Sequence, residues 1–280
     1  MAQPDNLLES SITHYLSTNE FKNKHIILTG GTGGIGQHVL KSLLQLGATL
    51  ACISRNKEKF PSFVTQYQSL GQFIPIQGDL SKPTTINTMM TEAMIKLGGK
   101  LDSLILCHGK FIFGSISQLS FESFDEVMNI NVRSNFHLLN LAVPFLKYTK
   151  GNVVMVSSVE AKVIEKDNLL HSLSKSMVNS LVQNAALELA SFGIRVNAVA
   201  PGIVNTQHRV GELLQSEDNL KYIAQMGRFC LLRDELLEPS NVADGVLFLA
   251  SSESAFMTGE VMVVDGGFEL NHDCSFTGSD

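Results

Sequence analysis

Short runs of apolar, often β-branched residues alternate along the chain with longer segments in which apolar positions recur at helical spacing. Repeated alternation of this kind indicates βαβ units, whose strands pair in parallel and are covered by helices on both faces. We therefore expect one α/β domain of the Rossmann type, with a doubly wound parallel sheet of about seven strands. The expected strands are residues 25–29, 49–53, 73–77, 101–107, 152–157, 194–199 and 260–265.

The segments outside this alternation predict the remaining organisation of the chain. Residues 1–22 are expected to form an N-terminal arm, with a short helix that carries several apolar residues on one side. The main domain covers 23–270, and 271–280 are expected to be a loose tail. Between about 206 and 238, a long stretch without a strand mixes apolar and charged residues, which favours a lid over a partly apolar small molecule. The apolar side of the arm would comprise Leu7, Leu8, Ile12 and Leu16.

Composition and charge narrow the class of protein. The chain is 44% hydrophobic and 17% charged, as expected for an ordinary globular protein, and its net charge is −6. Without a basic stripe, we expect neither nucleic acid nor a membrane surface as its partner. The first residues have no basic segment followed by a long apolar core, so a cytoplasmic location is expected. The four cysteines show no CxxC pair and are read as reduced thiols.

The segment TGGTGGIG, residues 29–36, joins the first expected strand to a helical pattern. Glycines in a strand-to-helix turn let the backbone approach a pyrophosphate, and the helix N-terminus offers free N–H groups. Glycines can also serve only as turn residues, but the position after the first strand favours a dinucleotide site. The candidate cofactor residues in this turn are Thr29, Gly30, Gly34, Ile35 and Gly36.

The end of the second expected strand bears on the choice of cofactor. It reads Ser54-Arg55-Asn56-Lys57, with no carboxylate at the position that would bind a ribose 2′-hydroxyl. An arginine at this position accommodates a 2′-phosphate, so Ser54 and Arg55 favour NADP over NAD. The alternative is that Arg55 is an ordinary surface charge.

Several motifs in this order resemble the short-chain dehydrogenase/reductase family over about residues 22–270. Its TGxxxGxG pattern is met by Thr29, Gly30, Gly34 and Gly36, and VVDGG at 263–267 matches the end of its last strand. The resemblance implies hydride transfer between a nicotinamide cofactor and a carbonyl or alcohol substrate. It also implies cofactor contacts from Asp79, Leu80, Gly109, Lys175, Pro201, Gly202, Val204 and Thr206.

The same resemblance implies a set of catalytic residues, with one substitution. Asn131 in NINV, Ser158 in VSSV and Lys175 stand at the positions of the family's catalytic asparagine, serine and lysine. The family's tyrosine, thirteen residues after the serine, is replaced by His171. Tyrosines occur only at 15, 67, 148 and 222, so no small register shift supplies one. Ser158 could instead cap a loop, and Asn131 could satisfy a backbone group.

His171 and Lys175 lie four residues apart and therefore share one face of the expected helix. In the family, the lysine holds the ribose hydroxyls and lowers the pKa of the tyrosine, which then donates a proton to the carbonyl oxygen. Imidazole, with an ordinary pKa of about 6.5, can exchange a proton near neutral pH without that help. It is shorter than a phenol, so it needs an adjusted pocket or one relaying water.

A second departure lies after the fourth expected strand. The family has Asn-Asn-Ala-Gly there, whereas this chain has Leu106, Cys107, His108 and Gly109, so other contacts must hold the turn. His108 and His137 have no second ligand at metal spacing, and we assign them structural roles and no metal site.

Three functions therefore remain open from the sequence. The first is an NADP-dependent oxidoreductase with a modified Asn-Ser-His-Lys tetrad. The second is an inactive NADP-binding protein that serves as a sensor or partner subunit, and the third is a dehydratase or isomerase that uses His171 as a base. The resemblance further implies a homodimer or homotetramer, in which the helices at about 121–148 and 170–192 pair across a two-fold axis.

Overall fold

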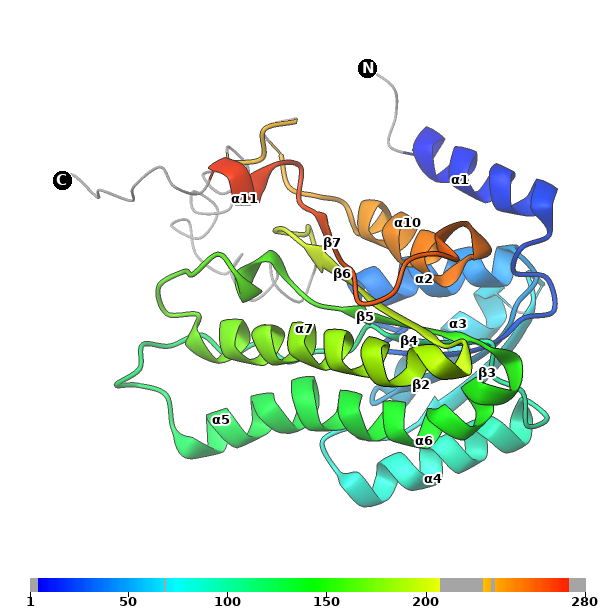
Figure 1. Ribbon diagram of the computed structural model, residues 1–280, viewed down its shortest axis with the longest axis horizontal. Coiled ribbons are helices and arrows are strands. Elements are labelled where there is room, and N and C mark those ends of the chain that lie inside the picture. Colours follow the sequence, from blue (N-terminus) through cyan, green and yellow to red (C-terminus); the bar gives the residue numbers. More distant parts are fainter. Residues whose placement is uncertain (1–4, 68, 207–228, 233–234, 272–280) are drawn as a thin grey trace.

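A computed structural model describes residues 5–67, 69–206, 229–232 and 235–271. Seven parallel strands form one sheet in the order β3-β2-β1-β4-β5-β6-β7 (Figure 1). This confirms the expected single-domain, doubly wound sheet. The strands are β1 (His25–Thr29), β2 (Thr49–Ser54), β3 (Gln72–Gln77), β4 (Ser103–Leu106), β5 (Asn152–Val156), β6 (Arg195–Pro201) and β7 (Val261–Val264).

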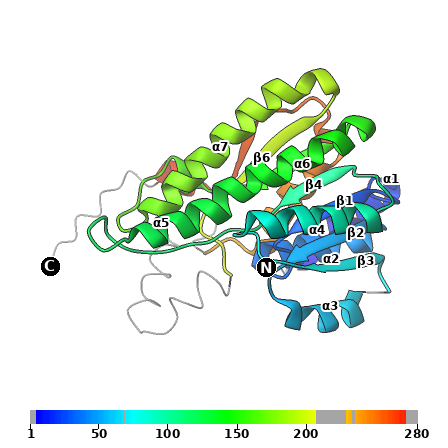
Figure 2. The ribbon, with the colours of Figure 1, turned by 90° about the horizontal axis from the view of Figure 1, so that it is seen from below.

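Helices cover both faces of this sheet. Helices α4, α6 and α7 lie on one face, while α2 and α10 lie on the other (Figures 1 and 2). Short 3₁₀ turns occupy Lys57–Lys59, Val159–Ala161, Ala190–Phe192 and Ser252–Ser254. The α-helices are α1 (Asp5–Thr18), α2 (Gly34–Gln45), α3 (Phe60–Tyr67), α4 (Pro83–Lys96), α5 (Phe121–Met128), α6 (Ser134–Thr149), α7 (Leu169–Leu189), α10 (Pro239–Ala250) and α11 (Phe268–Asn271).

The hydrophobic core is divided by the sheet into two layers. Successive side chains of a strand point to opposite faces, so Ile27 packs in the layer of α4, α6 and α7, whereas Ile26 and Leu28 pack in the layer of α2 and α10. Because both faces are covered, β1 is buried almost throughout. This arrangement explains why the strands read as continuous apolar runs rather than as alternating patterns.

The expected long helix at 121–148 is interrupted. Helix α5 ends at Met128, a π-helical segment spans Asn129–Arg133, and α6 begins at Ser134. The Ser134 hydroxyl donates to the carbonyl of Ile130. Such wide turns are often found at functional sites. Here the segment carries Asn131, which is fully buried.

The N-terminal helix contacts the domain through a residue that the sequence pattern did not single out. Tyr15 is buried in the layer of α2 and α10 and Ile12 packs against that layer, whereas Leu16 is 51% exposed. Glu20 accepts hydrogen bonds from the backbone N–H and hydroxyl of Ser252. These contacts attach the segment after α1 to the turn that follows α10.

Most of the expected lid, residues 207–228 and 233–234, lies outside the described residues, as do 272–280 of the expected tail and the side chains of Leu7 and Leu8. Within the described part of the chain, no helix has both the length and the apolar character needed to cross a membrane.

Candidate active site

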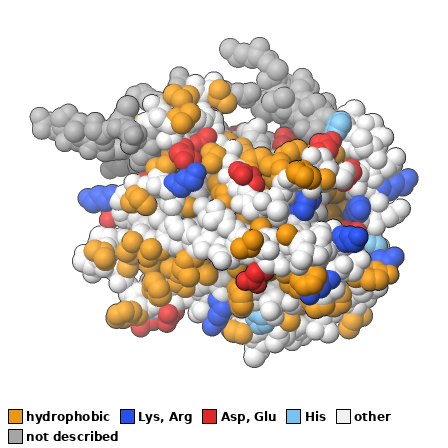
Figure 3. Space-filling model, viewed as in Figure 1, with side chains coloured by type: hydrophobic (Ala, Val, Ile, Leu, Met, Phe, Trp, Pro, Cys, Tyr) orange, Lys and Arg blue, Asp and Glu red, His pale blue; other side chains and the backbone are white. Residues whose placement is uncertain are grey.

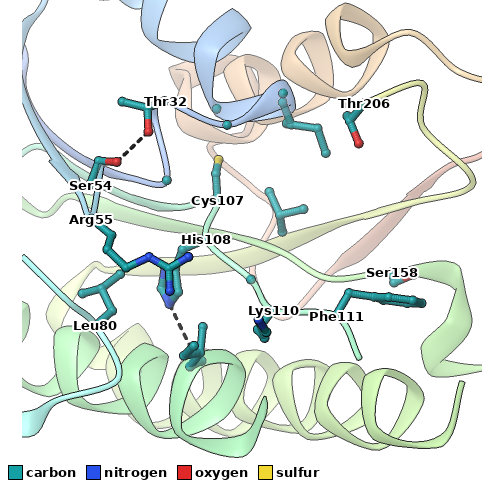
Figure 4. A pocket seen from close by; sticks show the side chains of 18 of the residues that line it. Thr32, Ser54, Arg55, Leu80, Cys107, His108, Lys110, Phe111, Ser158 and Thr206 are labelled. Carbon is teal, nitrogen blue, oxygen red and sulfur yellow. Dashed lines mark hydrogen bonds between the residues drawn. The ribbon is translucent and has the colours of Figure 1, made fainter. Parts of the chain in front are cut away.

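A cleft lies at the carboxyl ends of the central strands, and the glycine-rich turn after β1 lines part of it (Figure 4). Gly30 has φ +69°, a conformation that favours glycine, and a Cβ there would lie 2.9 Å from the Cα of His108. A Cβ on Gly36 would collide with the carbonyl oxygen of Gly30. The turn therefore cannot accept larger residues without moving, and its backbone lines the cleft.

The first turn of α2 faces this cleft with its backbone donors. The N-cap is Gly33, which has no side chain to cap the N–H groups of the first turn, and that turn contains no acidic residue. The leading N–H groups of a helix attract anions because they lack partners within the helix and lie at the positive end of its dipole. The donors and the tight glycine backbone fit the pyrophosphate of a dinucleotide.

Polar side chains surround the cleft where β2 and β3 end. The hydroxyls of Thr32 and Ser54 are hydrogen-bonded at 2.5 Å (Figure 4). The Lys59 ammonium donates to the carbonyl of Thr32 at 3.2 Å. Arg55 lies on the lining with an exposed side chain. Burial raises the pKa of Asp79, but hydrogen bonds from Ser81 and the charges of Arg55 and Lys82 outweigh it, so the pKa lies below its ordinary value.

His108 holds the turn after β4 that departs from the family pattern. Its Nδ1 lies 2.7 Å from the hydroxyl of Thr29, and its Nε2 lies 2.6 Å from the hydroxyl of Ser134. Desolvation, followed by the charge of Lys175, lowers the pKa of His108 to about 3. A neutral ring donates from Nε2 and accepts at Nδ1, so it links β1 to the start of α6. These contacts support the structural role expected for His108.

The side-chain amide of Asn131, in the π-helical segment, makes hydrogen bonds to the loop after β4 and to α7. Its Oδ1 accepts from the backbone N–H of Lys110 at 2.7 Å. Its Nδ2 donates to the carbonyl of Lys110 and to the hydroxyl of Ser174, each at 2.9 Å. Asn131 thereby fixes the loop after β4 against α7. Its side chain satisfies backbone groups and is not among the cleft-lining residues.

Lys175 and Ser158 both line the cleft where β5 ends. The Lys175 ammonium donates to the carbonyl of Val156 at 2.7 Å. Desolvation lowers the pKa of Lys175 to about 8, although the nearby groups Glu160 and Cys107 oppose this effect. The Ser158 hydroxyl accepts from the backbone N–H of Glu160 at 3.2 Å and so begins the 3₁₀ turn Val159–Ala161.

His171 is paired with a carboxylate that the sequence reasoning did not identify. Its Nε2 lies 3.2 Å from Oε2 of Glu160, whose side chain is only 1% exposed. Phe111 lies on the loop after β4, and its ring centroid is 4.8 Å from that of the imidazole. The signal that could have revealed Glu160 was a charged residue between the apolar Val159 and Ala161, four residues after the end of a buried strand.

Most of the residues expected from the sequence line the cleft, but Thr29 and Asn131 do not. Thr29 is bonded to His108, and Asn131 to Lys110. Cys107 also lines the cleft, but burial raises the pKa of its thiol to about 12, so it is no nucleophile at neutral pH. The expected residues on the lining are Gly30, Gly34, Ile35, Gly36, Ser54, Arg55, Asp79, Leu80, Gly109, Ser158, His171, Lys175, Pro201, Gly202, Val204 and Thr206. Thr32, Cys107, His108, Lys110 and Phe111 also line it and were not expected as cofactor or catalytic residues.

No three potential metal-binding side chains of the types His, Cys, Asp and Glu come together among the residues that the structure describes.

Comparison with known proteins places this geometry in context. The family model described as "Enoyl-(Acyl carrier protein) reductase" matches residues 30–269. The chain is 33% identical over 252 residues to a tropinone reductase homologue of Arabidopsis thaliana, covering 89% of this chain and 93% of that protein. A putative short-chain alcohol dehydrogenase of Sinorhizobium meliloti has a TM-score of 0.83 at 22% identity, covering 90% of this chain and 99% of that one. For an aldohexose dehydrogenase of Thermoplasma acidophilum the TM-score is 0.80 at 23% identity, with coverage of 91% and 97%.

Proposed function

Because this chain belongs to the short-chain dehydrogenase/reductase family, we propose that it is an NADP-dependent oxidoreductase acting on a carbonyl or alcohol substrate. The observation that carries the proposal is that His171, Ser158 and Lys175 line the same cleft as the dinucleotide cradle. A proton-exchanging side chain next to a nicotinamide site is what carbonyl reduction requires. When bound, the nicotinamide supplies or takes up the hydride.

In this proposal each catalytic side chain has one task. His171 exchanges a proton with the substrate oxygen, and the Ser158 hydroxyl donates a hydrogen bond to that oxygen. Lys175 contributes a positive charge at the end of β5 and, by resemblance to the family, holds the ribose hydroxyls. Asn131 acts indirectly, because its hydrogen bonds with Lys110 fix the loop that brings Phe111 against His171.

The preference for NADP is supported by the side chains at the end of β2. Arg55 lines the cleft next to Ser54, and Lys59 is held nearby through its hydrogen bond to Thr32. Two cations at this place suit a 2′-phosphate, and no carboxylate follows Ser54 directly to bind a 2′-hydroxyl. Asp79 lies on the next strand end and would face the adenine side, by resemblance to the family.

The substrate is proposed to be a small, partly apolar molecule. Phe111, Ile130 and Val156 contribute apolar surface to the cleft. The relatives carry names that refer to tropinone in one case and aldohexoses in another, so the family does not fix the substrate.

The protein is further proposed to form a homodimer or homotetramer. Apolar side chains gather on the surface over α5 and α7 (Figure 3). Among them Phe121 is 87% exposed and Met177 is 50% exposed. Contiguous exposed apolar surface favours association, and two-fold symmetry would let one face cover its copy. The exposed apolar residues on α5, on α6 and on α7 are Phe121, Phe124, Phe136, Tyr148, Leu169, Leu173, Met177 and Leu187.

The test is cofactor turnover followed by absorbance at 340 nm with a panel of ketones, aldehydes and alcohols. We expect NADPH oxidation or NADP reduction with at least one substrate, and loss of on the order of 10²-fold or more in His171→Ala. Tight NADPH binding without turnover of any substrate would favour the inactive binding protein instead. Conversion of a substrate without net change at 340 nm would favour a dehydratase or isomerase.

A further inference from the structure

The side chain of Phe111 lines the end of the cleft that holds Ser158 and His171, here called the reacting end. It is half-buried and lies beside Ser158, whereas Arg55 and Thr32 lie at the opposite end (Figure 4). The adenosine part of the cofactor is assigned to the end with Arg55. Phe111 therefore lies on the side of the cleft where a substrate would meet the nicotinamide.

The loop that carries Phe111 is fixed on both sides of it. The buried side chain of Asn131 accepts from the backbone N–H of Lys110 at 2.7 Å and donates to its carbonyl at 2.9 Å. Beyond Phe111, the backbone N–H of Gly114 donates to the carbonyl of Asp167 at 2.9 Å. These bonds hold the backbone of Phe111 in one place before any ligand arrives.

The ring of Phe111 packs against two other rings. Its centroid lies 4.8 Å from that of His171, with the two planes at 58°. Phe113 meets it edge to face, with the centroids 4.2 Å apart and the planes at 73°. Aromatic pairs prefer such tilted and edge-to-face arrangements, so the two contacts restrict the orientation of the ring. A ligand that packs against a restricted side chain loses little of its binding free energy to ordering that side chain.

The surroundings of the reacting end are apolar. Val159 directly follows Ser158, and Ile203 directly follows the cleft residue Gly202. Both pack with Phe268 in one buried cluster. A sugar requires hydrogen-bond partners along its length, whereas an apolar molecule is bound by removal of its surface from water. The reacting end therefore favours an apolar substrate over a polyhydroxylated one.

Charged side chains near this end are paired with one another. The Lys110 ammonium lies 3.4 Å from the carboxylate of Glu126, and the Lys162 ammonium lies 3.3 Å from that of Glu269. A charged substrate would have to compete with these pairs, but an uncharged ring would not. A flat ring also offers a π face to Phe111, which an alkyl chain or a saturated ring lacks.

Resting on the proposed function, we propose that Phe111 is a specificity-determining residue that selects substrates with an aromatic ring on the carbonyl or carbinol carbon. The substrate class is then aryl ketones and the corresponding secondary alcohols. The ring of the substrate packs against Phe111, and its oxygen lies toward Ser158. A saturated ring of the same size fills the same space without the aromatic contact.

The first test compares acetophenone with cyclohexyl methyl ketone, which has the same number of carbons but a saturated ring. The ratio of their kcat/KM values is measured in the wild type, Phe111→Leu and Phe111→Tyr, so the intrinsic reactivity of each ketone cancels between proteins. Phe111→Leu should lower the ratio of aryl to saturated ketone by roughly 10-fold, and Phe111→Tyr should keep it within about twofold. Equal ratios in the wild type and Phe111→Leu would overturn the proposal.

The matched control makes the same change outside the cleft. Phe256 is fully exposed, so Phe256→Leu should keep the wild-type ratio. NADPH binding of each variant, measured by cofactor fluorescence, shows that the variant is folded. A ketohexose completes the panel, and a higher kcat/KM with it than with either ring ketone would also overturn the proposal.

The second test needs no turnover. Benzamide and cyclohexanecarboxamide are unreactive analogues of the two ketones, and their binding to the NADP-loaded protein is measured by isothermal titration calorimetry. We expect benzamide to bind more tightly to the wild type, and this preference to be lost in Phe111→Leu. Equal affinities, or no binding of either amide, would contradict a ring-selecting role of Phe111.

The two levels of inference fail differently. A preference for benzamide that depends on Phe111, together with no turnover of any ketone or alcohol, would reject the proposed oxidoreductase and leave a cleft that binds aromatic rings. Turnover of saturated ketones or sugars with the same efficiency in the wild type and Phe111→Leu would reject the selection by Phe111 alone.

Discussion

The Lys175 ammonium lies 2.7 Å from the backbone carbonyl oxygen of Val156, to which it donates a hydrogen bond. This bond joins α7 to the end of β5, so the helix that carries His171 is fixed to the sheet at the cleft. The same burial that allows this contact lowers the pKa of Lys175 to about 8. The charge of the site is therefore sensitive to mildly alkaline conditions.

We expect kcat/KM to fall as pH rises above about 8, because Lys175 then loses the proton that gives the site its positive charge. In Lys175→Arg the fall should move to higher pH, since a guanidinium stays charged. The measurement is the pH profile of kcat/KM between pH 6 and 10. A wild-type profile without a fall in this range would contradict the assigned role of Lys175.

Replacing Arg55 should change the choice of cofactor. In Arg55→Ala we expect NADPH affinity to fall by about 10- to 100-fold, because a charge-assisted hydrogen bond to the 2′-phosphate is lost. NADH affinity should change little. Fluorescence titration with both cofactors measures the effect, and Lys150→Ala, at the exposed end of α6, is the control. Equal wild-type affinities for the two cofactors would refute the preference for NADP.

The variant His171→Tyr distinguishes two hypotheses: that His171 is adapted as the proton donor, or that it only replaces a catalytic tyrosine that was lost. If the pocket is adjusted to imidazole, the variant should lose activity on the true substrate, because the larger phenol meets Glu160 and Phe111. His171→Ala should lose more, on the order of 10²- to 10⁴-fold. Steady-state kinetics with one substrate for all three proteins decides the question. A gain of activity in His171→Tyr would show that the histidine is not the adapted proton donor.

His108 should make the fold sensitive to acid. Its pKa is about 3 in the folded protein and about 6.5 in an unfolded chain, so between these values the unfolded state binds more protons. The free energy of unfolding should therefore decrease as pH falls from about 6.5 toward 3, by at most about 1.4 kcal/mol per pH unit from this residue.

Urea denaturation at several pH values measures this slope. His108→Asn should reduce the slope while lowering stability at pH 7, since the bonds to Thr29 and Ser134 are altered. His137→Asn is the control, because His137 of α6 makes an exposed hydrogen bond to Asn87 of α4. An unchanged slope in His108→Asn would argue against a neutral, buried His108.

Association can be tested on the apolar face of α5 and α7. Light scattering should give the mass of a dimer or tetramer for the wild type at micromolar concentration. Met177→Glu, in the middle of this face, should shift the mass toward the monomer because it places a charge in the contact. Ile95→Glu, an equally drastic change at an exposed position of α4, should leave the mass unchanged. A monomeric wild type would overturn the prediction.

The sequence alone determined the architecture, because its determinants are local. The apolar run of β1, the glycines after it and the helical pattern that follows specify a strand, a tight turn and a helix without reference to distant residues. The same is true of the spacing between His171 and Lys175, since four residues on a helix always share a face. The π-helical segment around Asn131 and the contact made by Tyr15 were not visible, because packing rather than periodicity decides them.

Only the tertiary structure decided which side chains meet. His108 reads as an isolated histidine in the sequence, yet the parallel pairing of β1 with β4 brings it to Thr29. Glu160 lies eleven residues before His171, with an irregular connection between them, and no periodicity relates their side chains. The 3₁₀ turn Val159–Ala161 and the first turn of α7 bring the imidazole within 3.2 Å of the buried carboxylate. That contact depends on the packing of α7 against β5 and β6, which is why the tyrosine replacement could be seen in the sequence and its partner could not.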